Sequence, residues 1–584
     1  MRERLIAIIG ARLNSSRLPG KQLLDLSGRP LITHVLRRLR EIPNLDDIVL
    51  ATTADDFNKP LITWAKGEGV NYYAYIGDVN NLMARVNKVV EKFSADILMY
   101  VCGDSPLIDP PTLRRRVNLL LADPDGDVVD PPPLPNGGTY IHEGVSIYRR
   151  KFWNRMVEKA TKPFELEHVG AIYHVLNKVT PDKIVYAPEE PCFASIEHRI
   201  SVDTPSDYRF MRRIYDDWFE EHDGDSIVDL RQVVKRLHDD PELRELNSHV
   251  RQKTVHESSI TVTLLTQCGP HVGLGHVSRM TVAAGALQDH LSAGVSVVIE
   301  GPKSDHWELE ILPHQYVNSL TEEIVMEHLN SSPPNALVID MSDEKPWLKN
   351  ILRHCRNIEC RTIIVDRPWA DGYGDLYYFP SFFLPDHTKT LIKNKAVFGW
   401  DAFLLPKIPK KNLSSNTIKN CIVLTGAADV DNLGRDWPEK LIHALPPDIM
   451  ITWIQGPFAK APNYPNEANN FRVSIAPNNL AGSLYRADVA LCVYGVSLFE
   501  CLLAGVPAVG IYPNDRISNQ EWQAFQSSEV CLSGLPEEAA QLLQSLCHDS
   551  NLRVSLRMNA MNVMTGGGYH FAKTIGDLIQ KETD

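Results

Sequence analysis

The chain contains 584 residues, 43% of them hydrophobic and 23% charged, which is the composition of an ordinary globular protein. One hydrophobic core does not extend over this length, so we expect about three or four domains. The net charge of −13 argues against a nucleic-acid partner, because such a surface normally carries a clustered basic face.

Apolar runs typical of β-strands alternate with helical patterns along the whole chain, which indicates an α/β fold with mostly parallel sheets. The first third forms one such unit. Its residues 208–250 are charged and helical, as expected of a terminal helix pair and a connector. The strands predicted for this unit are Leu5–Ile9, Ile48–Thr52, Tyr72–Ile76 and Ile97–Cys102.

A short loop after the first predicted strand carries three cations, Arg12, Arg17 and Lys21, and we call residues 11–21 the Arg/Lys loop. Glycines at positions 10 and 20 would let the backbone approach a ligand. A strand, a flexible loop and clustered cations suit the phosphates of a nucleoside triphosphate. Charge density alone leaves a solvated basic turn as the alternative.

Two aspartates follow other apolar runs, where the ligands of open α/β sheets bind. Asp104 comes after the run that ends at Cys102, and Asp203 follows a short apolar stretch. Together they would hold Mg²⁺, or Mn²⁺ in its place, and neutralise a triphosphate for attack at its α-phosphorus. Lys21 and Arg12 would stabilise the pyrophosphate leaving group.

The alternative for Asp203 is a helix N-cap before Pro205. Asp207 lies in the helix that follows, and we expect it at the surface. The run of prolines and glycines at 131–138 predicts a loop.

The Arg/Lys loop resembles the nucleotide loop of sugar cytidylyltransferases, nearest to the branch with the spore-coat polysaccharide and pseudaminic acid enzymes. Three more segments of that branch occur in order, namely GDxPLID at 103–109, EHV at 167–169 and VDTPxD at 202–207. The resemblance covers about residues 1–245. It implies a Rossmann-like nucleotidyltransferase domain that uses CTP and a keto-sugar acid.

The resemblance also implies roles for individual residues. CTP would contact Gly10, Arg12, Arg17 and Lys21, with Arg12 and Lys21 acting in catalysis. The acceptor sugar would contact Glu143, Glu167 and His168, although a solvated surface position is the alternative for each glutamate.

The rest of the chain repeats the α/β pattern twice, with a lysine-rich boundary at 407–417. We therefore divide the chain into a cytidylyltransferase domain at 1–245, a linker at 246–258 and two further Rossmann-like domains at 259–410 and 411–584. The strands predicted for these two domains are Ile260–Leu265, Val295–Glu300, Ala336–Asp340 and Thr362–Asp366, then Cys421–Thr425, Ile449–Ile454, Asp488–Val493 and Ala508–Tyr512.

The first strand of the second unit is followed by GLGHVSR at 273–279, which we call the glycine–histidine loop. A glycine loop at a strand-to-helix crossover brings backbone close to a ligand, and His276 lies within it. An ordinary tight turn is the alternative for the loop, and a buried histidine bonded to backbone is the alternative for His276. Histidine suits proton transfer because its ordinary pKa is near neutral.

With the segments around Gly495–Glu500 and Asn519–Gln520, this loop resembles MurG-like enzymes and, more closely, the UDP-sugar hydrolase of pseudaminic acid synthesis. The resemblance covers about residues 258–570 and implies a GT-B-like pair of domains that takes a UDP-linked amino sugar. His276 would activate water and Glu500 would contact the ribose. The residues that would complete the UDP site are Gly275, Gly495, Ser497, Asn519 and Gln520.

This chain departs from that pattern at three places. Tyr494 replaces the first glycine of a GGST segment, and Leu498 replaces its threonine. An aspartate-plus-tyrosine segment appears as Asp340, Met341 and Ser342, without the aromatic hydroxyl.

Three functions therefore compete for the whole chain. The first is a bifunctional enzyme of nonulosonic acid activation, with a CMP-transferring end and a UDP-sugar-hydrolysing end. The second replaces the hydrolase with a glycosyltransferase, and the third replaces it with a non-catalytic nucleotide-sugar-binding module. A homo-oligomer is compatible with all three.

Ten cysteines include no CxxC pair and no zinc-like Cys/His spacing, as expected of thiols in a reducing compartment. The N-terminal apolar stretch is too short for a signal peptide, and no apolar run reaches about 18 residues. We therefore expect a cytoplasmic protein with no membrane span.

Overall fold

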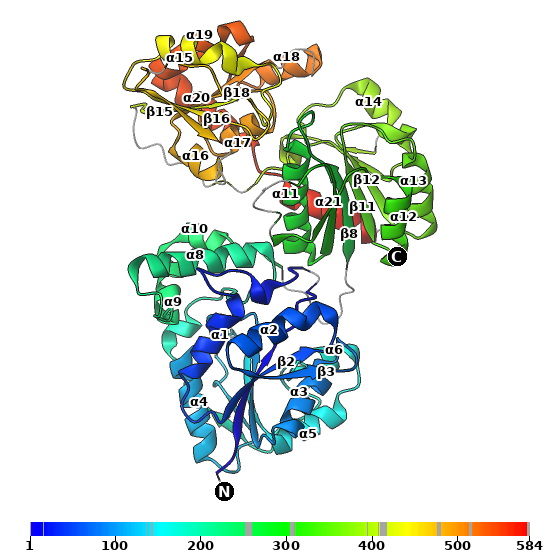
Figure 1. Ribbon diagram of the computed structural model, residues 1–584, viewed down its shortest axis with the longest axis vertical. Coiled ribbons are helices and arrows are strands. Elements are labelled where there is room, and N and C mark those ends of the chain that lie inside the picture. The colour runs from blue at the N-terminus through cyan, green and yellow to red at the C-terminus, as the bar shows by residue number, and fades with distance from the viewer. Residues whose placement is uncertain are drawn as a thin grey trace. The chain divides into compact units, whose positions relative to one another are not determined.

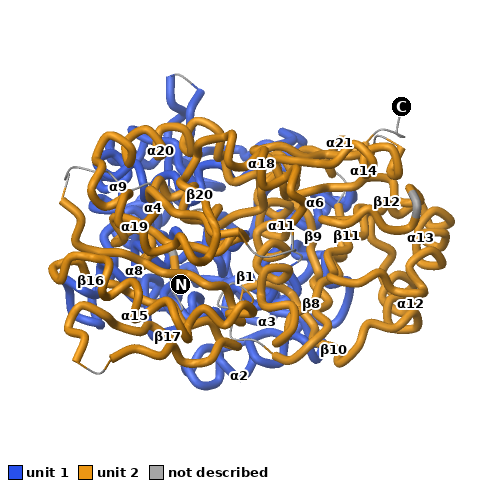
Figure 2. Tube along the Cα trace, turned by 90° about the horizontal axis from the view of Figure 1, so that it is seen from above, with its two compact units in different colours: residues 1–258 blue, residues 259–584 orange. Residues whose placement is uncertain are grey.

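The computed structural model describes residues 2–580 except 16, 136, 142–143, 252–259, 304–308, 310, 394, 407, 409–416, 466, 476–479 and 513–516. The chain forms two compact units, residues 1–258 and 259–584, which Figure 2 shows in different colours. No described helix is both long and apolar enough to cross a membrane.

The first unit is built on a seven-stranded sheet with the order β3-β2-β1-β4-β6-β5-β7. β1 to β4 run parallel, and β6 runs antiparallel to both β4 and β5. The four predicted strands are present, each within one residue of its predicted bounds. The strands are β1 (Leu5–Gly10), β2 (Asp47–Thr53), β3 (Asn71–Tyr75), β4 (Ile97–Cys102), β5 (Val128–Asp130), β6 (Val145–Arg149) and β7 (Ile184–Tyr186).

Helices cover both faces of this sheet (Figure 1), so its central strands are apolar without alternation. On β1, Leu5, Ala7 and Ile9 pack with α1, α2 and α4, whereas Ile6 and Ile8 pack with α3 and α5. The helices of the unit are α1 (Leu31–Arg40), α2 (Lys59–Gly67), α3 (Leu82–Lys92), α4 (Pro110–Ala122), α5 (Arg150–Lys159), α6 (Pro163–Glu167), α7 (Ala171–His174), α8 (Pro205–Glu221), α9 (Leu230–Asp239) and α10 (Pro241–Glu245).

The end of the first unit differs from the predicted helix pair and linker. Three helices, α8 to α10, follow one another there. Asn247, inside the predicted linker, is 1% exposed and bonded to two segments of the unit. Most of the predicted linker, from residue 252 onward, lies outside the described residues.

The second unit contains two parallel sheets. Their orders are β10-β9-β8-β11-β12-β13-β14 and β17-β16-β15-β18-β19-β20. All eight predicted strands are present within two residues. The strands are β8 (Thr261–Gln267), β9 (Gly294–Glu300), β10 (His314–Val317), β11 (Ala336–Asp340), β12 (Arg361–Val365), β13 (Leu376–Tyr378), β14 (Ala396–Val397), β15 (Asn420–Leu424), β16 (Met450–Gln455), β17 (Phe471–Ile475), β18 (Val489–Val493), β19 (Ala508–Ile511) and β20 (Leu532–Gly534).

The helices of the second unit cover its sheets. They are α11 (Gly275–Leu291), α12 (Glu322–Ser331), α13 (Leu348–Asn357), α14 (Asp386–Leu391), α15 (Trp437–Ala444), α16 (Leu480–Arg486), α17 (Val496–Leu503), α18 (Asn519–Ser527), α19 (Ala539–His548), α20 (Ser550–Val563) and α21 (Gly568–Gln580). The predicted α/β class, with three Rossmann-like sheets in tandem, is confirmed.

The C-terminal helix α21 does not stay with the last sheet. Phe571, Ala572 and Ile575 belong to the core around β8, β9 and α11, and Figure 1 shows α21 beside α11. The apolar face of α21 is therefore buried in the domain predicted for 259–410, so that domain is discontinuous in sequence. The lysine-rich boundary predicted at 407–417 lies mostly outside the described residues.

Candidate functional site

The Arg/Lys loop begins where β1 ends, beside the adjoining central strand β4. A Cβ at Gly10 would lie 2.6 Å from the ring of Tyr100, so this close approach requires glycine. Gly20 has a φ of +72° and turns the chain into the short helix that starts at Lys21. The loop therefore delivers Lys21 to the carboxyl ends of β1 and β4.

Lys21 joins the two aspartates expected to hold metal. Its Nζ donates to Asp203 Oδ1 at 2.7 Å and also to Asp104. Lys21 is 5% exposed. Burial alone would lower its pKa, but the carboxylates of Asp104 and Asp203 outweigh burial and raise it. The ammonium is therefore charged in this position.

Two arginines complete the pairing of Asp203. Arg17 Nη2 lies 3.2 Å from Oδ1, and Arg199 donates to Oδ2. Although burial acts in the opposite direction, Lys21, Arg17 and Arg199 hold the pKa of Asp203 well below its usual range. Arg199 was not identified from the sequence. The only sequence feature that could have indicated Arg199 is its position four residues before Asp203, a predicted metal ligand.

Arg12 connects the Arg/Lys loop to the segment expected to contact sugar. Its Nη2 donates to Glu167 Oε1 at 3.0 Å, and its Nη1 donates to Asn80 Oδ1 at 2.7 Å. The side chain of Glu167 is 43% exposed. His168 packs its ring on Phe164, with ring centroids 4.6 Å apart. Glu143 lies outside the described residues.

The structure places Asp203 and Asp207 differently from two sequence interpretations, the alternative of a helix N-cap for Asp203 and a surface position for Asp207. Thr204, not Asp203, is the N-cap of α8, and its side chain accepts from Asp207 N. The surface position expected for Asp207 is wrong, because its side chain is fully buried. The Asp207 carboxylate closes a capping box with Thr204 and accepts from Arg199 Nε at 3.0 Å. These bonds compensate for burying a charge.

The carboxylates of Asp104 and Asp203 fit a divalent cation in their number and in their convergence on one position. Within the described residues, no group of three or more His, Cys, Asp or Glu side chains is gathered as a metal site. Asp104 and Asp203 nevertheless converge on one cation, the Lys21 ammonium. Mg²⁺ commonly takes one or two carboxylates and fills its remaining positions with water and phosphate. Two converging carboxylates match that donor set.

In the second unit, His276 lies in the first turn of α11, next to the last residue of β11. His276 Nδ1 is 2.7 Å from Asp340 Oδ1 and 3.0 Å from Arg279 Nη2. The shorter distance and the ionised carboxylate favour Nδ1–H donating to Asp340. Under this assignment Nε2 is the basic nitrogen.

Arg279 binds the carboxylate of Asp340 and a second carboxylate, that of Asp366. It donates to both oxygens of Asp340, at 3.1 and 2.7 Å, and to Asp366 Oδ2 at 3.0 Å. Burial alone would raise the pKa of Asp340, but Arg279 and His276 outweigh it and lower that pKa. From the sequence, Asp340 was only the end of a predicted strand and part of a departure from a motif, with no role assigned to it. The register of β8 and β11 makes it the partner of His276.

Of the segments expected to bind UDP, the start of α17 has a contact with the glycine–histidine loop. A Cβ at Gly275 would lie 3.8 Å from Val496 Cγ2, at the start of α17, the helix whose N-cap is Gly495 and whose first turn includes Ser497. Glu500 is 7% exposed on α17. The predicted Asn519–Gln520 pair forms the exposed first turn of α18.

Tyr494, the main departure from the GGST pattern, is held in place on two sides. Its hydroxyl donates to Glu521 Oε1 at 2.8 Å. Its ring packs edge-on against Phe499, Trp522 and Phe525. The side chain therefore fastens the end of β18 to α18.

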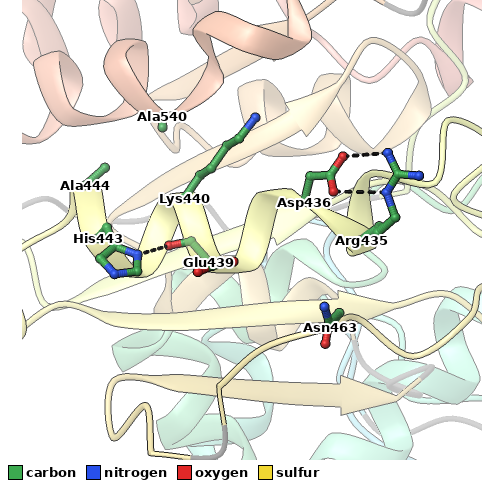
Figure 3. Close-up of a pocket in the computed structure, with 8 residues that line it drawn as sticks. All are labelled: Arg435, Asp436, Glu439, Lys440, His443, Ala444, Asn463 and Ala540. Atoms are coloured by element: carbon green, nitrogen blue, oxygen red, sulfur yellow. Dashed lines mark hydrogen bonds and ion pairs between the residues drawn. The ribbon is translucent and has the colours of Figure 1, made fainter.

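A surface cavity of about 860 Å³ lies elsewhere in the second unit (Figure 3) and contains none of the predicted site residues. Arg435 pairs with Asp436 at 2.9 Å, and His443 Nδ1 donates to the carbonyl of Glu439 at 2.7 Å. These side chains are engaged with one another or with their own helix. We assign the cavity no role.

The two units are similar to different known proteins. Residues 6–232 match the family model described as Cytidylyltransferase. An uncharacterized protein of Methanocaldococcus jannaschii is 28% identical over 44% of this chain and 98% of its own. A 3-deoxy-manno-octulosonate cytidylyltransferase of Geobacter metallireducens is 28% identical over 35% of this chain and 94% of its own. The first unit therefore contains a cytidylyltransferase-family domain, as its resemblance predicted.

The second unit has a solved structural neighbour. MurG of Acinetobacter baumannii aligns with 55% of this chain and 99% of its own, at a TM-score of 0.36 and 16% identity.

Proposed function

We propose that the first unit transfers CMP from CTP to a keto-sugar acid and releases pyrophosphate. The observation that carries this proposal is Lys21 held between Asp104 and Asp203 in a domain of the cytidylyltransferase family. The Geobacter relative is named for 3-deoxy-manno-octulosonate, and the sequence motifs resemble enzymes of nonulosonic acids. Both acids belong to the proposed substrate class.

The cations of the Arg/Lys loop exchange partners when CTP binds. In this structure Arg12 is neutralised by Glu167, and Lys21 by two aspartates. Asp104 and Asp203 would hold Mg²⁺ or Mn²⁺, and that cation would supply positive charge opposite the triphosphate. Lys21 and Arg12 then pair with phosphate oxygens and stabilise the charge that develops on pyrophosphate. The acceptor hydroxyl oxygen bonds to the α-phosphorus, its proton passes to solvent, and the bond from that phosphorus to pyrophosphate breaks.

Pyrophosphate release by the full-length protein tests this function. CTP and Mg²⁺ are offered with 3-deoxy-manno-octulosonate, with a pseudaminic-type nonulosonic acid, or with no acid. We expect release only when an acid of this class is present. Equal release with and without acid, or none with any acid, would overturn the assignment.

For the second unit we propose hydrolysis of a UDP-linked amino sugar. The supporting observation is the His276–Asp340 pair, whose neighbour Gly275 contacts the start of α17, where Gly495 and Ser497 lie. His276 Nε2 accepts a proton from water, whose oxygen bonds to the anomeric carbon as UDP leaves with the glycosidic oxygen. Asp340 stabilises the imidazolium that forms. The proposed product is a free 2,4-diacetamido-trideoxyhexose of the same activation pathway.

A reaction in ¹⁸O-labelled water distinguishes the three functions considered for this unit: hydrolase, glycosyltransferase and non-catalytic binding module. Hydrolysis in H₂¹⁸O places ¹⁸O in the sugar and leaves the UDP unlabelled. A glycosyltransferase releases UDP only when an acceptor is added, and its product carries no ¹⁸O. UDP-sugar binding without any UDP release would favour a non-catalytic module.

A further inference from the structure

A buried cluster lies directly behind Asp203 in the first unit. It consists of Asp207 on α8, Arg199 before that helix, and Asn247 beyond α10. Asp207 and Asn247 are at most 1% exposed. The family match ends at residue 232, so Asn247 comes from chain beyond the matched domain.

Asp207 controls both the backbone and the side chain of Asp203. Its Oδ2 accepts from the backbone nitrogens of Asp203 and Thr204, each at 3.0 Å. The same oxygen accepts from Arg199 Nε at 3.0 Å, and the other end of that guanidinium donates to Asp203 Oδ2. With Oδ2 occupied in this way, Asp203 Oδ1 is the oxygen that faces Lys21 and Arg17.

Asn247 supports this arrangement from the other side. Its Nδ2 donates to Asp207 Oδ1 at 3.0 Å and to the carbonyl of Arg199 at 3.1 Å. One amide therefore fixes both members of the pair behind Asp203. Burial raises the pKa of Asp207, and the bonds from Arg199 and Asn247 counteract part of that rise.

We propose that Asp207, Arg199 and Asn247 are positioning residues that hold Asp203 in the orientation needed at the nucleotide site. The proposal rests on the proposed cytidylyltransferase function. It predicts that a segment outside the matched domain contributes to that activity. None of the three residues needs to touch the substrate.

The test compares full-length Asp207→Asn with wild type. The amide keeps the shape of the side chain, removes its charge and can no longer accept from all these donors. We expect pyrophosphate release to fall about 10- to 100-fold, with a similar rise in the Mg²⁺ concentration for half-activity, as for lost partners of metal ligands. Glu220→Gln, an exposed carboxyl on the same helix, is the matched control and should change neither.

Two further variants separate positioning from folding. Arg199→Lys keeps the charge but cannot span Asp207 and Asp203, so it should resemble Asp207→Asn. Asn247→Ala removes no charge and should shift the Mg²⁺ requirement in the same direction by a smaller factor. A protein that melts as wild type does but needs more Mg²⁺ supports positioning.

The outcomes distinguish this inference from the function on which it rests. The first outcome is an active wild type whose activity and Mg²⁺ requirement are unchanged in folded Asp207→Asn and Asn247→Ala. That outcome overturns the positioning role alone. A lower melting temperature in both variants without any shift in the Mg²⁺ requirement also overturns it. Inactive wild type with every acid overturns the proposed function, and the inference with it.

Discussion

The Arg/Lys loop and the glycine–histidine loop occupy the same place in two different sheets. Each follows the central strand, β1 or β8, and each faces an aspartate at the end of the adjoining strand, Asp104 after β4 or Asp340 in β11. In the first sheet the aspartate faces Lys21, and in the second it faces His276 and Arg279. One topology thus presents a lysine to the aspartate in one unit, and a histidine together with an arginine in the other.

The effect of a carboxylate at this position depends on the side chain that it pairs with. Beside Lys21, an aspartate neutralises a cation that can move to phosphate. Beside His276, an aspartate favours the proton on Nδ1 and leaves Nε2 without it. The shared position follows from the crevice at the carboxyl ends of neighbouring parallel strands.

The largest effect that would sharpen this comparison is expected for His276→Ala. UDP release should fall at least about a hundredfold, because a positioned proton acceptor contributes about 10²- to 10⁴-fold. CTP-dependent pyrophosphate release should stay within about twofold, since each site is built from residues of its own compact unit and sites without shared partners behave independently. Both rates are measured on the same full-length preparation.

His271→Ala is the control for that prediction, because His271 is exposed near the same loop. If folded His276→Ala loses both activities, the two sites are coupled. If it keeps normal UDP release, the histidine is structural.

Lys21→Ala should produce the converse pattern. We expect pyrophosphate release to fall by about a hundredfold or more, the scale of one lost transition-state contact. UDP release should not change. Lys59→Ala removes an exposed lysine of the same unit and serves as the control. Near-normal pyrophosphate release in folded Lys21→Ala would falsify the assignment of the loop.

Asp104→Asn and Asp203→Asn should each raise the Mg²⁺ concentration for half-maximal pyrophosphate release by at least about tenfold. The amide preserves shape but removes the charge that attracts the cation. The measurement is a metal titration at saturating CTP, with circular dichroism to confirm folding. A titration of Asp203→Asn that superposes on wild type would show that Asp203 serves only to pair Lys21, Arg17 and Arg199.

The smallest effect is expected for Glu500→Ala. A contact to the ribose serves affinity more than chemistry, so KM for the UDP-sugar should rise about tenfold, the scale of one lost hydrogen bond to a charged group. The kcat should change by less than about twofold. A fall in kcat with unchanged KM would instead place Glu500 in the chemistry.

Much of the fold could be predicted from local pattern. All twelve predicted strands lie within two residues of the observed ones, because continuous apolar runs mark strands buried on both faces. The C-terminal helix could not be placed this way. An amphipathic pattern shows that α21 must cover something, but not that it covers the core around β8 and α11.

Sequence pattern was enough to locate the Arg/Lys loop, the glycine–histidine loop and Asp104, since these follow apolar strands within a few residues. Which charges meet depends on how the chain folds. Asp340 pairs with His276 through strand register, and Asp207, expected at the surface, is buried with Arg199 and Asn247. The physical reason is that burying a charge requires partners, and those partners come from segments that only the folded chain brings together.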